Sequence, residues 1–234
     1  MYHSITIGSR NTWDDWHLIP SSRPLFNPPT VKTNTVDIPG GDGVLDLSNA
    51  LAGRPTYNNR TGSWTFYVEN GFKDWSVLYS EIMVYLHGQT FKAFLEDDPG
   101  YYYEGRFSVN AWKSDKDYSQ ITIDYDVGPY KKDSSVVGSE WLWDTFNFET
   151  GVIRNYKNLV VNNTLSVVVI GDMMENVPVI ICSDSGMSVE YDGTSYSLSK
   201  GSNTVSEIVL HQGENTLVFS GSGTVTIENV GGRL

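Results

Sequence analysis

Apolar and polar positions along the chain predict one helix, in the first half of the sequence. Between Asp74 and Gly88, apolar residues recur three and four positions apart, which is the spacing of one face of an α-helix. Asp74 can accept hydrogen bonds from the free amides of the first turn, and Gly88 can take the left-handed conformation that often ends a helix. The helix should lie against the rest of the chain through an apolar stripe, which consists of Trp75, Leu78, Tyr79, Ile82, Tyr85 and Leu86.

The residues after the helix alternate between apolar and polar side chains, as β-strands do. Residues 91–96 and 101–112 read as two strands joined by an Asp-Asp-Pro-Gly turn. A second polar turn leads into another strand at residues 120–127. We therefore expect one helix packed against an antiparallel meander.

The region before the helix is expected to be mostly extended. Prolines bias residues 26–40 away from helix, and residues 40–53 read as a glycine turn that leads into a short strand or a single helical turn. Residues 58–70 predict a turn followed by a strand. One face of that strand is apolar and consists of Trp64, Phe66 and Val68.

The second half of the chain has a different pattern. After Tyr130 the residues become small, polar and charged, as in a connection between domains. From there, short β segments follow one another with turn residues between them, and no helical spacing is found. We predict a mainly β protein of two domains, residues 1–132 and residues 133–234, of which the second is a small β-sandwich.

Charge and cysteine content narrow the classes of protein that fit. Lys plus Arg total 16 and Asp plus Glu total 28, so the formal net charge is −12, and no cationic cluster is present to grip nucleic acid. Cys182 is the single cysteine, so no disulfide framework is expected, and its apolar neighbours predict a buried side chain. The chain has no apolar leader and no run near the ~20 residues of a membrane span. We expect synthesis in the cytoplasm and no membrane insertion.

The sequence offers little support for catalysis, a metal or a cofactor. The four histidines are scattered without carboxylate or cysteine partners at ligand spacing, and no nucleophile elbow is present. The glycines at 40, 41 and 43 lack the Lys and Ser/Thr of a phosphate-binding loop. Glu96, Asp97, Asp98 and Glu104 could suggest a hydrolase pair, but Asp97 and Asp98 are adjacent and belong to a natural β-turn. We expect that the protein is not an enzyme and holds no cofactor or metal.

Three consecutive tyrosines beside this turn are more informative. Side chains alternate along a strand, so Tyr101, Tyr102 and Tyr103 cannot all face one core. At least one should face outward, and exposed tyrosines are favoured at protein interfaces.

The first half of the chain closely resembles a known family. The resemblance runs through NTWDDWHLIPSSRPLFNPPTVKTNTVDIPG and RTGSWTFYVENGFKDWSVLYSEIMVYLHGQTFKAFLEDDPGYYYEGRFSVNAWKSDKDYSQITIDYDVGPYK, and LEDDPGYYYEGRF and SDKDYSQITIDYDVGPYK are its most specific motifs. These residues resemble the N-terminal region of the distal tail (Dit) proteins of siphophages and prophages of Gram-positive bacteria. The closing segment, GENTLVFSGSGTVTIENVGGRL, is similar to the smaller C-terminal sandwich of that family.

The resemblance implies a structural virion protein of the phage tail. Members of this family form a hexameric hub at the distal end of a long non-contractile tail, at the baseplate. The implied partners are the other copies in the homohexamer, the tail tube protein, the tape measure protein and the tail tip or fibre protein, which is similar to a tail-associated lysin. The first domain would be a tube-related β-sandwich with one packed helix and a β-hairpin, building the ring, and the second a galectin-like β-sandwich. The protein would be made in the host cytoplasm and end in the virion tail tip.

Candidate interface residues follow from the turn and its tyrosines. Ring contacts are assigned to the hairpin that carries Asp98, Tyr101, Tyr102, Tyr103 and Arg106. A second expectation is that part of the negative charge lines the central channel of the ring and prevents DNA from binding to the channel wall.

Two other classes of function stay open at this point. A carbohydrate-binding module contributing to host adsorption would stack sugars on exposed aromatics, and its candidates are Trp141, Trp143 and Tyr191. Trp141 and Trp143 follow the linker directly, so packing at the boundary between the two domains is an alternative role for them. A cell-wall hydrolase would need a catalytic carboxylate pair that the sequence does not provide.

Overall fold

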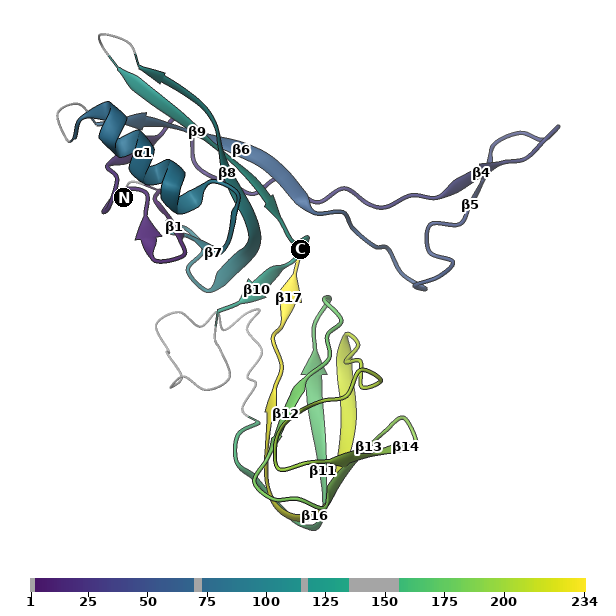
Figure 1. Cartoon of the computed structure of the whole chain (residues 1–234). Helices are drawn as coiled ribbons and strands as arrows, with labels where there is room; N and C mark the ends of the chain where they lie inside the picture. Colours follow the sequence, from purple (N-terminus) through teal and green to yellow (C-terminus); the bar gives the residue numbers. More distant parts are fainter. Residues whose placement is uncertain (1–2, 70–72, 115–117, 135–155) are drawn as a thin grey trace. The chain divides into compact units, whose positions relative to one another are not determined.

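The computed structural model describes residues 3–69, 73–114, 118–134 and 156–234, and the fold is mainly β, as predicted (Figure 1). Its contacts divide the chain into two compact units, residues 1–131 with Leu234 and residues 132–233. The elements of the first unit are β1 (Ile5–Ile7), β2 (Arg10–Asn11), β3 (Leu18–Pro20), β4 (Thr35–Asp37), β5 (Val44–Asp46), β6 (Arg60–Val68), α1 (Trp75–Leu86), β7 (Gln89–Leu95), β8 (Tyr101–Ser114) and β9 (Ser119–Val127). The strands that follow are β10 (Lys131–Asp133), β11 (Leu159–Gly171), β12 (Val179–Cys182), β13 (Met187–Tyr191), β14 (Thr194–Leu198), β15 (Gly201–Thr204), β16 (Gly213–Glu228) and β17 (Gly232–Arg233).

The predicted meander is confirmed. Strands β7, β8 and β9 pair antiparallel in chain order within a sheet of order β2-β1-β7-β8-β9-β6-β3. The register of β8 against β9 shifts between Val109 and Ala111. Strand β6 joins β9 from the other side with Trp64, Phe66 and Val68 buried, as the alternation predicts.

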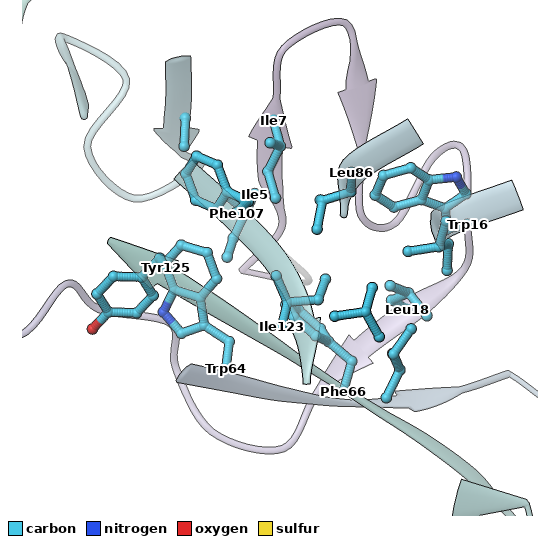
Figure 2. Close-up of a cluster of buried hydrophobic side chains, with 14 of the residues drawn as sticks. Ile5, Ile7, Trp16, Leu18, Trp64, Phe66, Leu86, Phe107, Ile123 and Tyr125 are labelled. Atoms are coloured by element: carbon cyan, nitrogen blue, oxygen red, sulfur yellow. The ribbon is translucent and has the colours of Figure 1, made fainter. Parts of the chain in front are cut away.

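Helix α1 matches the prediction in position and in its buried face. Leu78, Ile82 and Leu86 are fully buried, and the aromatic members of the predicted stripe are partly buried against the same core. Figure 2 shows Leu86 beside Ile5, Ile7 and Trp16 in that core, which strands β1, β6, β8 and β9 complete. The apolar stripe therefore orients the helix on the sheet.

The two ends of the helix differ in how well the sequence predicted them. Gly88 has a φ of +75°, and its N–H donates to the carbonyl of Phe107 at 2.8 Å, so its role in ending the helix is confirmed. The predicted side-chain cap at Asp74 is wrong, because its carboxylate makes no capping hydrogen bond. The Asp74 main-chain carbonyl instead accepts the N–H of Leu78 at 3.0 Å.

Residues 31–57 form an arm that the sequence did not predict as such. Val31 and Tyr57 form a bridge at its base, and the short strands β4 and β5 pair as a hairpin further out. Gly40 and Gly43 have φ values of +75° and +79°, which makes the predicted glycine turn the tip of this hairpin. Figure 1 shows the arm leading away from the sheet of the first unit.

The second unit is built around a long antiparallel pair. Strand β11 pairs with β16 over its whole length, and the other strands follow the order β14-β13-β16-β12-β15. Cys182 is buried in its core with 2% of its surface exposed, as predicted. Burial raises the pKa of its thiol and keeps it in the neutral form. The galectin-like character of this unit stays a prediction.

Candidate functional site

The turn between β7 and β8, together with the start of β8, carries the side chains that the sequence singled out. Tyr102 and Tyr103 are only 5% and 9% exposed. The Tyr103 ring lies 4.0 Å from that of Phe26, between centroids, on the core side. On the opposite face, Tyr102 lies against Phe94, with Lys92 Nζ 4.7 Å from its ring centroid. At least one of the three tyrosines was expected to face outward. Tyr102 and Tyr103 do not, because both faces of β8 are covered here, whereas Tyr101 is half-buried.

The other members of the predicted interface are more accessible. Tyr101 is half-buried, with Lys131 Nζ 4.1 Å from its ring centroid, and the same ammonium donates to Asp98 Oδ2 at 2.7 Å. Arg106 is exposed, and its guanidinium donates to the main-chain carbonyl of Gly88. Asp98, Tyr101 and Arg106 are thus the predicted contacts that a neighbour could reach, and their role in a ring stays a prediction.

The carboxylates of the turn between β7 and β8 form hydrogen bonds to segments that are distant in the sequence. Glu96 accepts the Ser4 N–H at 2.7 Å, and Asp97 accepts hydrogen bonds from His3 Nδ1 and Arg23 Nε, both at 2.9 Å. Burial alone would raise the pKa of Asp97, but the hydrogen bonds from Arg23 and His3 outweigh it and lower the pKa. These contacts tie β1 and the segment after β3 to the turn, which is a structural role.

Neither a metal centre nor a membrane span emerges from the described residues. Among them, no three histidine, cysteine or acidic side chains come together as metal ligands. Within the same residues, no helix is long and apolar enough to cross a bilayer.

A buried arginine anchors the base of the arm. Arg60 is 5% exposed, and its guanidinium donates to the carbonyls of Pro129 at 2.8 Å and Asn27 at 3.0 Å. Burial lowers the pKa of Arg60. The hydroxyl of Tyr125 accepts the Asn27 N–H at 2.9 Å. These bonds fix the place from which the arm departs.

We expect Tyr125→Phe to destabilise the first unit by about 1–2 kcal/mol, because the partly buried Asn27 N–H loses its acceptor. The free energy of unfolding from urea titration measures this loss. Tyr118→Phe, at a more exposed tyrosine, should change it far less. Equal stability of Tyr125→Phe and the parent protein would mean that this hydrogen bond does not hold the arm base.

The outer part of the arm has one uncovered apolar face. Val36 lies opposite Leu45 across the hairpin, and Ile38 and Leu47 follow them at two-residue spacing. These four side chains are between 37% and 50% exposed. An isolated two-stranded hairpin is at best marginally stable in water, so a partner surface on this face would stabilise the hairpin.

The second unit gives the sugar-stacking prediction no geometric support. Tyr191 is partly buried against the core, and its hydroxyl donates to the Val209 carbonyl at 2.6 Å and lies 3.2 Å from Asn215 Oδ1. Burial raises the pKa of Tyr191. Trp141 and Trp143 lie outside the described residues.

Comparison with known proteins rests on structure. No family model matches the sequence, and no curated protein matches it. The fold is similar to the crystal structure of the SPP1 Dit (gp 19.1) protein, with a TM-score of 0.60, 12% identity and coverage of 99% of each chain. That protein is described as a paradigm of the hub adsorption apparatus in phages that infect Gram-positive bacteria. At this identity the likeness establishes a common fold.

Proposed function

We propose that this chain is a structural hub protein of a phage tail, related in role to the Dit protein whose fold it shares. The observation that carries the proposal is the likeness over 99% of both chains, because it includes both units and not one common sandwich. The protein would stand at the distal end of a long non-contractile tail, as part of the baseplate. It would join the tail tube and tape measure proteins to the tip or fibre protein, without catalysis.

The proposed assembly is a homohexameric ring built by the first unit. A ring closes by repeating one head-to-tail contact, so each copy needs two different complementary surfaces. The arm supports this assembly, since its apolar face is uncovered within a single copy. Asp98, Tyr101 and Arg106 are further candidate contacts.

The mass of the full chain in solution tests the proposal. Light scattering over a range of concentrations should give a six-fold multiple of the 26.1 kDa chain mass, and negative-stain images should show rings. A monomer at every concentration would contradict a ring that forms in solution.

A further inference from the structure

We infer that strand β11 of the second unit pairs with β11 of a second copy of this chain. The two strands run antiparallel about a two-fold axis at Thr164, so the contact uses the same surface on both copies. The head-to-tail contact of the proposed ring joins two different surfaces. The pairing of β11 is therefore a separate contact, which can form between rings or between single chains.

Strand β11 is a long open edge. It has 13 residues and pairs with β16 on one side, and no other strand of the described residues pairs with it. The strands at the two ends of the same sheet, β14 and β15, have only 5 and 4 residues. Native proteins protect a sheet edge with short strands, proline or charged side chains. Strand β11 contains neither proline nor a charged residue, so its edge can accept another strand.

Hydrogen bonds near the start of β11 show which main-chain groups face the open side. Val160 lies opposite Thr224 on β16. The Thr224 N–H donates to Ser183 Oγ at 2.8 Å, and its carbonyl accepts the Ser183 N–H at 3.0 Å. Both groups of Thr224 therefore point away from β11. In an antiparallel ladder the main-chain groups of its partner Val160 then point the other way, to the open edge.

The far end of the strand has the same orientation and closes the edge. The Ile170 N–H donates to the Tyr156 hydroxyl at 2.9 Å, and the Ile170 carbonyl accepts Asn229 Nδ2 at 3.1 Å. These bonds lie on the side away from β16. Every second residue from Val160 to Val168 thus presents its main-chain groups to the open edge, and Ile170 is already satisfied.

The side chains along this edge suit a second copy of the same strand. With Thr164 opposite Thr164, Val160 lies opposite Val168 and Asn162 lies opposite Ser166. All five are exposed in the single chain, the two valines by 69% and 45%. Paired β-branched and hydrogen-bonding side chains on adjacent strands stabilise a sheet, and each valine would cover the other.

The strand leaves the regular extended conformation close to the proposed axis. Asn163 has a φ of +66°, and Gly221 opposite it has a φ of +121°. This irregularity lies one residue from Thr164, so those of the two copies would lie next to each other at the centre of the contact.

Charge favours this edge as a place where two copies meet. The chain carries a formal net charge of −12, so most surfaces of two copies repel each other. The residues of β16 that lie beside the edge on the exposed face are uncharged as well: Thr216, Val218, Ser220, Ser222 and Thr224. Pairing along β11 therefore brings no like charges together.

A disulfide between copies tests the inference. Two short strands bind weakly, so the contact is captured covalently in the full chain. Residues opposite each other in a hydrogen-bonded antiparallel pair have Cα atoms about 5.5 Å apart, within disulfide range. Thr164→Cys, oxidised with copper phenanthroline, should give a dimer and no longer ladder on a non-reducing denaturing gel. Cys182 is buried, so the parent protein should give none.

The control for chance collision is Ser197→Cys, at an exposed position on β14. It should link at least about tenfold more slowly than Thr164→Cys, because no contact raises its effective concentration. Circular dichroism and the unfolding midpoint of both variants should match those of the parent protein, since both side chains are exposed.

The register has a test of its own. Val160→Cys alone and Val168→Cys alone should link as slowly as Ser197→Cys, because each cysteine would face a valine. A mixture of the two variants should link rapidly, and mass spectrometry of the peptides should find residue 160 of one chain joined to residue 168 of the other.

Equal rates for Thr164→Cys and Ser197→Cys would overturn the inference and leave the edge to a strand of another protein. Val160→Cys that links to itself as fast as Thr164→Cys would overturn the two-fold register. These results are distinct from those on the ring. A Thr164 link in a protein that forms no ring would support the β11 contact and contradict the proposed assembly, and a ring without the link would do the reverse.

Discussion

Gly105→Ala is expected to destabilise the first unit by at least about 3 kcal/mol, at or beyond the upper end of overpacking costs. A Cβ at this position would lie 2.2 Å from the main-chain oxygen of Asp126 and 2.4 Å from the Cα of Val127. Both atoms belong to the backbone of β9, opposite β8 in the centre of the sheet. A side chain could rotate away, whereas here the two strands must separate. Urea unfolding, followed by circular dichroism and tryptophan fluorescence, measures the loss.

The chain offers a matched control for this substitution. A Cβ on Gly128 would meet only the Glu104 oxygen, at 3.8 Å, which is ordinary van der Waals contact. Gly128→Ala should therefore keep the unfolding midpoint close to that of the parent protein. Similar midpoints for the two variants would mean that β8 and β9 can separate at little cost, against the register described here.

Leu45→Asp is expected to convert the proposed hexamer into monomers. Leu45 and Val36 face each other on the apolar side of the arm, and a carboxylate there would have to be buried without a partner in the neighbouring copy. Loss of a buried apolar contact and burial of an unpaired charge both lower the stability of the contact between copies. Light scattering of the full chain reads out the change in mass.

Two variants control for effects other than lost contact. Leu45→Met keeps an apolar side chain of similar volume and should keep the ring. Circular dichroism of Leu45→Asp should match the parent protein, because Leu45 is half exposed in the single copy. A hexamer of unchanged stability in Leu45→Asp would show that the arm does not close the ring.

The sequence predicted the regular parts of the first unit well. The spacing of Leu78, Ile82 and Leu86 predicted helix α1, and the alternation of Trp64, Phe66 and Val68 predicted the buried face of β6. These patterns are strong because one face is buried over several turns or residues. The Asp74 cap was predicted wrongly because a competent residue type does not fix the side-chain rotamer.

The candidate site was harder to predict, for a physical reason. Alternation predicts that one of two adjacent side chains on a strand faces away from the core, but it does not say what else covers that second face. At Tyr102 it is covered by Phe94 and Lys92, which alternation along β8 could not reveal. The arm was missed because β4 and β5 are three residues each, too short for a clear period. Val36 and Leu45 beside a glycine turn were the available signal.

The path of the chain through the second unit has a consequence for how such proteins diversify. Strand β10, where the unit begins, pairs with β17, where it ends, and the Asp133 N–H donates to the Gly231 carbonyl at 3.0 Å. The points where the chain enters and leaves the second unit therefore lie side by side. Recombination that exchanges the segment between them would present the first unit with the same pair of attachment points. Such geometry would let the second unit be replaced while the sequence of the first unit stays constant.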